Sequence, residues 1–337
     1  MRSMSPEFFR ESSFLVTGGT GSIGSEIVRQ LIDLGAVVVR IFSRDETKQY
    51  LFQEELGSRS NLRYLIGDVR DGARLRRAMQ GIDYVFHAAA LKHVPSCEYN
   101  PFEAVQTNVY GTQQVLQAAL EAGVKRVVTI STDKAVSPVS TMGATKLLAE
   151  KIVSSSQSWT KGHVLCSVRF GNVLGSRGSI TQLVREQVQR GGPVTLTDPA
   201  MTRFMMPIPK AVGLVLEALC QSRGGETFIL RMPALKVCDL LQVLVEEWSS
   251  VLNIDPGGIE IKTIGKRPGE KLHEALMTAE EAERAEMGEE VFVIPPSHVL
   301  GAGDPIAPEE YLSDRAHLLD VEGIRMLLRD ADLFKSS

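Results

Sequence analysis

An acidic and a basic side chain stand side by side shortly after an apolar run: Asp133 and Lys134 follow Arg126–Ile130. A carboxylate and an ammonium group in contact shift each other's pKa, which suits a pair that exchanges protons with a substrate. A solvated turn at the end of a strand often has the same composition. The pair alone therefore leaves two interpretations open, general acid–base catalysis and a surface turn.

A glycine-rich segment lies near the start of the sequence, between the apolar run Phe14–Val16 and a helical pattern over Glu26–Leu34. Glycines allow a tight turn and let backbone N–H groups approach a pyrophosphate at the positive end of a helix. The place of this segment between a buried strand and a helix predicts a dinucleotide site, and a purely structural turn is the alternative. The residues expected to bind the cofactor here are Gly18, Thr20, Gly21, Ser22, Ile23 and Gly24.

The end of the second predicted strand indicates which dinucleotide binds. NAD sites usually place an acidic residue there for the ribose diol, whereas arginine accommodates the 2′-phosphate of NADP. Arg44 holds this position, and Ser43 and Lys48 offer further donors. NADP is therefore preferred over NAD, although Asp45 offers a carboxylate that could still bind the diol.

The strand ends that follow contribute three more expected cofactor residues. Asp68 is predicted to accept a hydrogen bond from the adenine amine, and capping a helix is its alternative role. Val69 and Ala88 follow the third and fourth predicted strands and complete the expected cofactor site.

Up to about residue 175 the sequence alternates between apolar runs and helical patterns. Continuous apolar runs suit a parallel sheet buried on both faces, so the alternation predicts an α/β fold with a doubly wound parallel sheet of the Rossmann type. The predicted strands are Phe14–Val16, Val37–Phe42, Tyr64–Ile66, Tyr84–Phe86, Arg126–Ile130 and Val164–Arg169. The predicted helices are Glu26–Leu34, Ala73–Met79, Pro101–Ala122 and Thr141–Ser156.

After Asn172 the rhythm changes and predicts a smaller mixed α/β substrate lobe, interleaved with a last strand of the large sheet. We expect residues 1–175 and about 205–232 to form the dinucleotide-binding domain, and 176–204 and 233–337 to form the lobe. Helices are predicted at Ser179–Gln189, Pro207–Cys220, Val237–Val251 and Thr278–Met287, extended segments at Val194–Thr197, Thr227–Leu230 and Glu260–Ile264, and a loop at Pro295–Pro308.

Composition excludes several classes of function. A net charge of -4 without a basic stripe gives no reason to expect nucleic acid. The four widely spaced cysteines form no Cys-x-x-Cys pair, which makes a zinc site unexpected and suits a reducing compartment. The charged N-terminus does not resemble a signal peptide, and no apolar stretch is long enough for a membrane span, so a cytoplasmic protein is expected.

Several longer motifs carry a resemblance to one enzyme family. They are Ser131-Thr132-Asp133-Lys134-Ala135, Thr141-Met142-Gly143-Ala144-Thr145-Lys146, Ala88-Ala89-Ala90-Leu91-Lys92-His93-Val94-Pro95, Asn172-Val173-Leu174-Gly175-Ser176-Arg177-Gly178-Ser179, Met201-Thr202-Arg203-Phe204 and Arg267-Pro268-Gly269-Glu270-Lys271-Leu272-His273-Glu274. Over about residues 12 to 295 the sequence resembles the UDP-N-acetylglucosamine 4,6-dehydratases, which are extended short-chain dehydrogenases/reductases that begin the synthesis of unusual bacterial surface sugars.

The resemblance implies a reaction in which hydride moves from sugar carbon 4 to NADP, water leaves from carbons 5 and 6, and the hydride returns to carbon 6. It assigns Asp133 as the acid at the leaving hydroxyl, Lys134 as the base at carbon 5, and Lys146 as the lysine of a Tyr-x-x-x-Lys motif. Met142 replaces the tyrosine, and a thioether exchanges no proton. Some relatives also carry methionine here, and in them a threonine that corresponds to Thr132 is the suggested partner of the carbon 4 hydroxyl.

The resemblance also implies a pocket for the diphosphate of a UDP-sugar, with Met142 as part of its wall. Arg203 and Arg267 are expected at the diphosphate or ribose, and Glu270 at the ribose hydroxyls. Lys92 is expected at a diphosphate and Asn172 at the first phosphate. Each of these charged side chains could instead form a surface salt bridge.

Two other functions remain open. A UDP-N-acetylhexosamine 4-epimerase would use the same cofactor loop and sugar motifs, but epimerisation needs no acid at carbon 6, which disfavours it. A non-catalytic NADP-binding sensor is supported only by Met142. The sequence does not fix the stereochemistry at carbon 5, and relatives lead us to expect a homo-oligomer, either a dimer or a hexamer.

Overall fold

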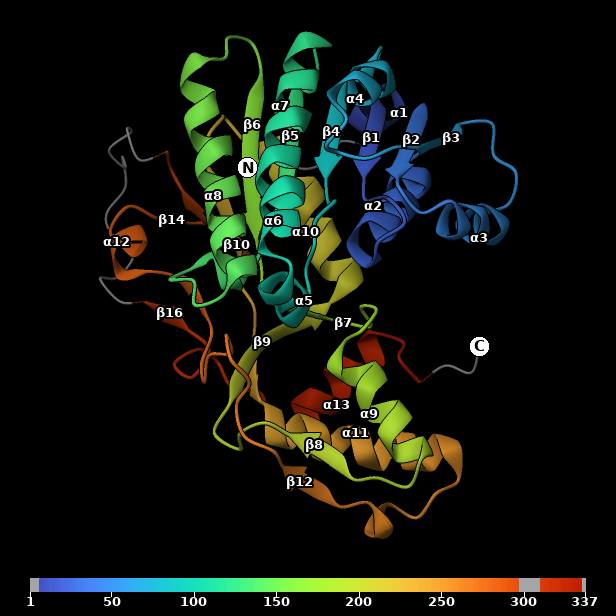
Figure 1. Ribbon diagram of the computed structural model, residues 1–337, viewed down its shortest axis with the longest axis vertical. Coiled ribbons are helices and arrows are strands. Elements are labelled where there is room, and N and C mark those ends of the chain that lie inside the picture. Colours follow the sequence, from blue (N-terminus) through green and yellow to red (C-terminus); the bar gives the residue numbers. More distant parts are fainter. Residues whose placement is uncertain (1–5, 297–309, 335–337) are drawn as a thin grey trace.

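The computed structural model describes residues 6–296 and 310–334, and its centre is a nine-stranded sheet (Figure 1). The strand order is β14-β15-β10-β6-β5-β4-β1-β2-β3. These strands are β1 (Ser13–Thr17), β2 (Val38–Ser43), β3 (Leu62–Ile66), β4 (Tyr84–His87), β5 (Arg126–Ile130), β6 (Val164–Arg169), β10 (Thr227–Leu230), β14 (Glu286–Met287) and β15 (Val291–Ile294). Neighbours from β3 across to β10 are parallel, whereas β15 runs antiparallel to β10 and to β14.

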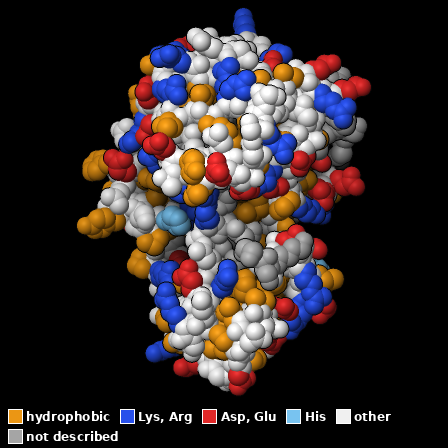
Figure 2. Space-filling view, turned by 90° about the vertical axis from the view of Figure 1, so that its right-hand side faces the viewer, with side chains coloured by type: hydrophobic (Ala, Val, Ile, Leu, Met, Phe, Trp, Pro, Cys, Tyr) orange, Lys and Arg blue, Asp and Glu red, His pale blue; other side chains and the backbone are white. Residues whose placement is uncertain are grey.

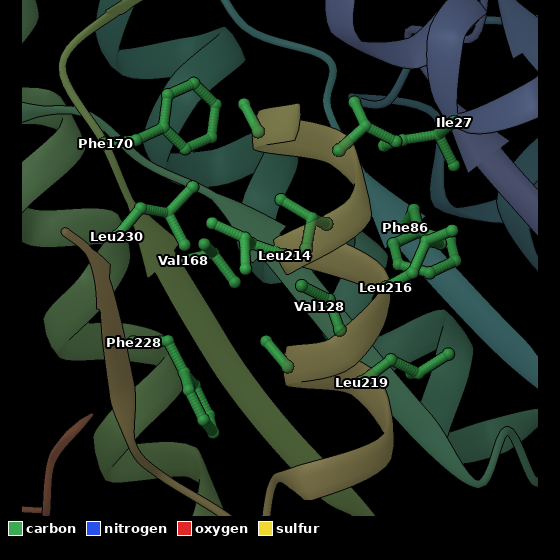
Figure 3. Close-up of a cluster of buried hydrophobic side chains, with 14 of the residues drawn as sticks. Ile27, Phe86, Val128, Val168, Phe170, Leu214, Leu216, Leu219, Phe228 and Leu230 are labelled. Atoms are coloured by element: carbon green, nitrogen blue, oxygen red, sulfur yellow. The ribbon is translucent and has the colours of Figure 1, made fainter. Parts of the chain in front are cut away.

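Helices cover both faces of this sheet because its strands are apolar on both sides. Phe14 and Val16 of β1 pack in one cluster with Ile27 of α2 (Ser22–Asp33) and with α10 (Ile208–Gln221). Leu15 points the other way, toward α4 (Gly72–Met79), α7 (Gly111–Glu121) and α8 (Thr141–Ser156). Figure 3 shows Leu214 and Leu219 of α10 against Val128 and Val168 of the sheet. The predicted doubly wound α/β fold is confirmed.

The order of the parallel strands creates a crevice. The chain steps outward from β1 to β2 and β3, then crosses back so that β4 pairs with the other edge of β1. The loops after β1 and β4 therefore diverge at the carboxyl ends of the strands, where ligands of doubly wound folds bind.

A lower lobe with its own apolar cluster lies below the carboxyl ends of the parallel strands (Figure 1). It contains the small sheets β7 (Asn172–Leu174), β9 (Thr202–Pro207) and β11 (Ala234–Lys236), and β8 (Val194–Leu196) with β12 (Ile261–Thr263). Its helices are α9 (Ile180–Gln189), α11 (Val237–Leu252) and α13 (Val321–Asp330). A further pair, β13 (Ala275–Met277) and β16 (Tyr311–Leu312), lies beside the start of β9, where the Ser313 hydroxyl contacts both Thr202 and the backbone of Glu274.

Two predicted helices differ in the structure. The helix expected over Pro101–Ala122 consists of α6 (Pro101–Ala104), a π-helix η1 (Val105–Tyr110) and α7. The helix expected over Thr278–Met287 is wrong: a capping box at Thr278 starts α12 (Ala279–Ala282), but Glu286 and Met287 then pair with β15 as the edge strand β14. The remaining helices are α1 (Pro6–Arg10), α3 (Glu46–Leu56), α5 (Val94–Tyr99) and the 3-10 turns η2 (Asp133–Ala135), η3 (Gln157–Trp159) and η4 (Pro256–Gly258). The loop expected at 295–308 lies almost entirely outside the described residues.

Candidate active site

The glycine-rich loop after β1 lies close to the chain that follows β4. Gly18 has φ +66°, and a β-carbon there would lie 2.7 Å from the backbone nitrogen of Ala89. A β-carbon on Gly24 would lie 2.3 Å from the carbonyl oxygen of Gly18. Gly21 precedes α2 and has no side chain to cap it, so the first amides of α2 remain available to an anion. The loop has the geometry that a pyrophosphate site requires.

A cavity of about 760 Å³ opens at the carboxyl ends of the parallel strands. Figure 2 shows a recess between the upper part of the molecule and the lower lobe, with basic side chains gathered beside it. Most residues expected from the sequence line the cavity: Gly18, Thr20, Gly21, Ser22, Ile23, Gly24, Ser43, Arg44, Lys48, Val69, Ala88, Lys92, Thr132, Lys134, Met142, Lys146 and Asn172. Five expected residues lie outside this lining: Asp68, Asp133, Arg203, Arg267 and Glu270.

At the β2 end of the cavity, two carboxylates already have partners. Asp45 caps α3 by accepting a hydrogen bond of 2.9 Å from the backbone of Lys48, and its other oxygen lies 2.9 Å from Lys48 Nζ. Asp68 is held by the guanidinium of Arg70 at 2.7 Å, and it does not cap α4, whose cap is Asp71. The Arg44 guanidinium lies 3.6 Å from Asp68 and is half-exposed.

The acid–base pair follows β5 and forms a compact cluster with its neighbour. The Thr132 hydroxyl donates to Asp133 Oδ1 at 2.8 Å, and Lys134 Nζ donates to the same oxygen at 3.0 Å. Asp133 is fully buried, and its Oδ2 has no hydrogen-bond partner within the described residues. Thr132 and Lys134 reach the cavity, so Asp133 lies directly behind them.

A second carboxylate, absent from the sequence prediction, faces Lys134. Glu274 Oε1 lies 3.5 Å from Lys134 Nζ and 3.8 Å from Arg203 Nε, and the Glu274 side chain is 3% exposed. Burial alone would lower the pKa of Lys134, but the charges of Asp133 and Glu274 outweigh it and raise this pKa. The two carboxylates therefore hold Lys134 as an ammonium group.

Lys146 and Met142 lie on the first turns of α8. Lys146 is buried and donates to the carbonyl of Ile130 at 2.5 Å. Burial lowers the pKa of Lys146 to about 8, and Glu150 only partly opposes this shift. Met142 is 4% exposed and packs with Cys97 while lining the cavity.

Asn108, on the π-helix, braces this region. Its side-chain NH2 group donates to the Thr145 hydroxyl and to the carbonyl of Leu91. Its side-chain oxygen accepts a hydrogen bond from the backbone N–H of Leu91. These contacts connect the loop after β4 to α8.

The expected substrate residues separate into two groups. Asn172 lines the cavity with a buried Oδ1 that has no hydrogen-bond partner in the described chain, and Lys92 donates to the carbonyl of Arg177 at 2.7 Å. Arg203 is buried and donates to the backbone carbonyls of Thr202, Lys271 and Leu272. Its guanidinium therefore supports the lobe here.

Arg267 and Glu270 lie in the loop before β13, where Glu270 accepts from the backbone N–H of Arg267 at 3.1 Å. Neither side chain reaches the cavity lining, and their contact with a diphosphate or ribose stays a prediction.

Arg177 was missed by the sequence reasoning. Its guanidinium donates to the carbonyl of Thr20, and its backbone N–H donates to the Ser22 hydroxyl at 3.0 Å. The loop from Gly175 to Ser179 thus closes against the phosphate loop. The Asn172–Ser179 motif, which contains Arg177, was the available signal.

Comparison with known proteins places the chain in a family. Residues 14–296 match the family described as "Polysaccharide biosynthesis protein". The chain belongs to this family. A protein of Methanocaldococcus jannaschii, named an uncharacterized membrane protein, is 50% identical over 96% of this chain and 97% of its own length. A UDP-glucose 4-epimerase of Rickettsia rickettsii is 38% identical over 96% of this chain and 97% of its own length.

Solved structures agree with this placement. Pen from Bacillus thuringiensis has a TM-score of 0.90 at 44% identity and covers 96% of this chain and 98% of its own. A dTDP-glucose 4,6-dehydratase from Streptomyces venezuelae, solved with NAD bound, has a TM-score of 0.68 at 28% identity. It covers 77% of this chain and 86% of its own. The fold is that of the extended short-chain dehydrogenases/reductases.

Two negative findings concern the described ranges. Every helix in residues 6–296 and 310–334 is too short or too polar to span a lipid bilayer. Within the same ranges, His, Cys, Asp and Glu side chains form no group of three or more that could hold a metal ion.

Proposed function

We propose that this protein is a UDP-N-acetylglucosamine 4,6-dehydratase that produces a UDP-4-keto-6-deoxy sugar with a recycled NADP, for the synthesis of a surface polysaccharide or glycan. The observation that carries the proposal is the cluster of Thr132, Asp133 and Lys134 at the cavity that the glycine loop and Lys146 also line. Residues 1–175 and about 205–232 would hold the cofactor, and the lower lobe would hold the UDP-sugar.

The site residues fit NADP. Uncapped amides at the start of α2 suit its pyrophosphate, and Lys146 suits the hydroxyls of the nicotinamide ribose. When bound, NADP would accept a hydride from carbon 4 of the sugar and return it to carbon 6. NADP is preferred over NAD because Asp45 already caps α3 and pairs with Lys48, which leaves Arg44 as the group at the adenosine ribose.

The Thr132–Asp133 hydrogen bond offers a path for the proton of the carbon 4 hydroxyl. Met142 accepts no proton, so the acceptor must be another group at the wall. The Thr132 hydroxyl can take the sugar's proton as it passes its own to Asp133, 2.8 Å away. Asp133 then becomes the carboxylic acid that the next step needs.

Elimination uses the same cluster, and its protons balance. The neutral amine of Lys134 takes the carbon 5 proton, the electron pair of that bond forms the carbon 5–carbon 6 double bond, and the carbon 6–oxygen bond breaks. Asp133 gives its proton to the departing hydroxyl, which leaves as water. Lys134 later returns its proton to carbon 5 as carbon 6 is reduced, so the original carbon 4 hydroxyl proton departs in the water.

A UDP-sugar 4-epimerase is the second candidate, because relatives at 38% identity that match 96% of the chain are named UDP-glucose 4-epimerases. An epimerase returns the hydride to carbon 4 and needs neither a base at carbon 5 nor an acid at carbon 6. The acid–base pair favours the dehydratase, because the fully buried Asp133 carboxylate is costly to keep charged and is paired with a lysine that reaches the cavity.

Proton NMR and mass spectrometry of a reaction with UDP-N-acetylglucosamine test the proposal. The expected product has lost one water and, in heavy water, carries deuterium at carbon 5, with no net consumption of NADP. A product of unchanged mass and inverted carbon 4 would establish the epimerase instead. Unchanged sugar from protein that retains NADP would refute both activities on this substrate.

A further inference from the structure

Glu274 links the C-terminal part of the chain to the catalytic loop. Its backbone N–H donates to the Ser313 hydroxyl at 2.9 Å, and its carbonyl accepts from the Ser313 N–H at 2.9 Å. Its side-chain oxygen Oε1 lies 3.5 Å from Lys134 Nζ. One residue thus touches both the β13–β16 region and the acid–base pair.

The charges around Glu274 form a cluster. Lys134 lies between the carboxylates of Asp133 and Glu274, and Arg203 lies 3.8 Å from Glu274. Lys271 donates to the carbonyl of Val136 and interacts with both carboxylates and with Glu310. Asp133 and Glu274 are both almost fully buried, and each keeps one oxygen without a partner in the described residues. Buried carboxylates persist only where cations compensate them, so this cluster acts as a unit.

The position of the Lys134 amine depends on this cluster. A lysine side chain is a flexible stem with a mobile head, and one hydrogen bond to Asp133 does not fix its direction. Two carboxylates, at 3.0 and 3.5 Å, confine the amine between the catalytic loop and Glu274.

We propose that Glu274 is a positioning residue that orients the Lys134 amine and strengthens it as a base toward carbon 5 of the sugar. This inference rests on the proposed dehydratase function. Glu274 itself does not line the cavity and acts only through Lys134. Its negative charge favours transfer of the carbon 5 proton to nitrogen, at the cost of keeping that nitrogen protonated between turnovers.

The inference predicts a particular pH profile. Turnover requires the neutral amine, so the rate rises with pH as Lys134 loses its proton. Glu274→Gln removes a negative charge and leaves Arg203 to repel the ammonium group, which lowers the pKa of Lys134. The increase in rate should therefore occur at a lower pH than in the wild type. The plateau falls about ten-fold, because the amine is a weaker and less confined base. If Glu274 only supported the fold, the variant would have a lower maximal rate, but the rate would increase at the same pH as in the wild type.

The experiment measures deuterium incorporation at carbon 5 of UDP-N-acetylglucosamine against pH, with the full chain carrying NADP. Glu274→Asp keeps the charge and should restore part of both effects. Glu280→Gln, an equal charge change on an exposed residue of α12, should match the wild type. A Glu274→Gln profile whose rise stays at the wild-type pH would overturn the inference.

A second measurement is independent of turnover. Competitive labelling with an amine reagent, followed by mass spectrometry, reports the pH at which Lys134 becomes reactive in the NADP-bound protein. The midpoint should be lower in Glu274→Gln than in the wild type, and an unchanged midpoint would overturn the inference. If the wild type makes no dehydrated sugar but the midpoint still shifts, the contact between Glu274 and Lys134 stands and the proposed reaction fails.

Discussion

Arg169 forms a bidentate ion pair with Glu150 in the interior of the protein. Glu150 lies on α8, one helical turn after Lys146. Arg169 Nε donates to one carboxylate oxygen at 3.1 Å and Nη2 to the other at 2.6 Å, and both side chains are almost fully buried. Arg169 also contacts Glu281 and the carbonyl of Leu276. The pair therefore anchors α8, which carries Lys146 and Met142, to β6 and to the region around β13 and α12.

Glu150→Gln should lower the stability of the protein strongly, because it leaves Arg169 with one carboxylate fewer in the interior. Removal of one partner of a buried pair costs about 3–5 kcal/mol. Glu55→Gln, which breaks the exposed pair with Arg29, should cost less than about 1 kcal/mol. Urea unfolding of the three proteins measures the difference, and equal midpoints for the two variants would contradict the anchoring role of Arg169.

Lys134→Gln should separate the two halves of the proposed reaction. The carbon 4 hydroxyl can still pass its proton through Thr132 to Asp133, but carbon 5 has no base, so reduced cofactor should accumulate. Absorbance at 340 nm in a single turnover measures this, while dehydrated product should fall by a factor on the order of 10²–10⁴.

Asp133→Asn is the comparison for that variant. It should slow the absorbance rise as well, because the acceptor of the carbon 4 proton is lost. Lys125→Gln, a change at an exposed lysine, should behave as the wild type. Full dehydration by Lys134→Gln would remove Lys134 from the proposed mechanism.

The affinity for NADP should fall as the pH rises through about 8, the pKa to which burial lowers Lys146. Below this pH the side chain is an ammonium group and attracts the anionic cofactor, and above it the attraction is lost. The 2′-phosphate of NADP is already ionised in this range and adds no opposing change. Titration calorimetry from pH 7 to 9 measures the trend, and Lys146→Met should abolish it. An affinity that stays constant in the wild type would show that Lys146 does not contact the cofactor.

Arg44→Ala should weaken NADP binding about ten- to a hundred-fold, the worth of a charge-assisted hydrogen bond, and leave NAD binding nearly unchanged. Arg59→Ala removes an exposed arginine on the connection between α3 and β3 and serves as the control. Dissociation constants for both cofactors give the selectivity. Equal losses for NAD and NADP would assign Arg44 to the common part of the dinucleotide.

The sheet and the phosphate loop were predictable because their signals are local. Runs such as Phe14–Val16 are apolar on both faces, and the glycines of the loop follow a strand directly, so the order of residues along the chain was sufficient. The helix expected over Thr278–Met287 failed because pairing with β15, a tertiary contact, decides the state of Glu286 and Met287.

The contacts of the site were harder to predict than its residues. Glu274 meets Lys134 only because the chain returns to the catalytic loop just before β13, after α9, α11 and β12 of the lower lobe, and no spacing in the sequence encodes that return. The same folding directs Arg203 to backbone carbonyls and leaves Arg267 on the exposed loop, although both belong to recognisable motifs. Motifs indicate which residues matter, and their partners are set by tertiary structure.

The strand β15 pairs with β10 only late in translation, because it lies near the C-terminal end of the sequence. Residues 291–294 cover the open side of β10, so a ribosome must complete most of the chain before that edge is closed. Until then an apolar strand offers unpaired backbone groups to other nascent chains. Truncated products that end before residue 291 should therefore be cleared by proteases or chaperones, and gene fusions that preserve β15 should be tolerated better than those that interrupt it.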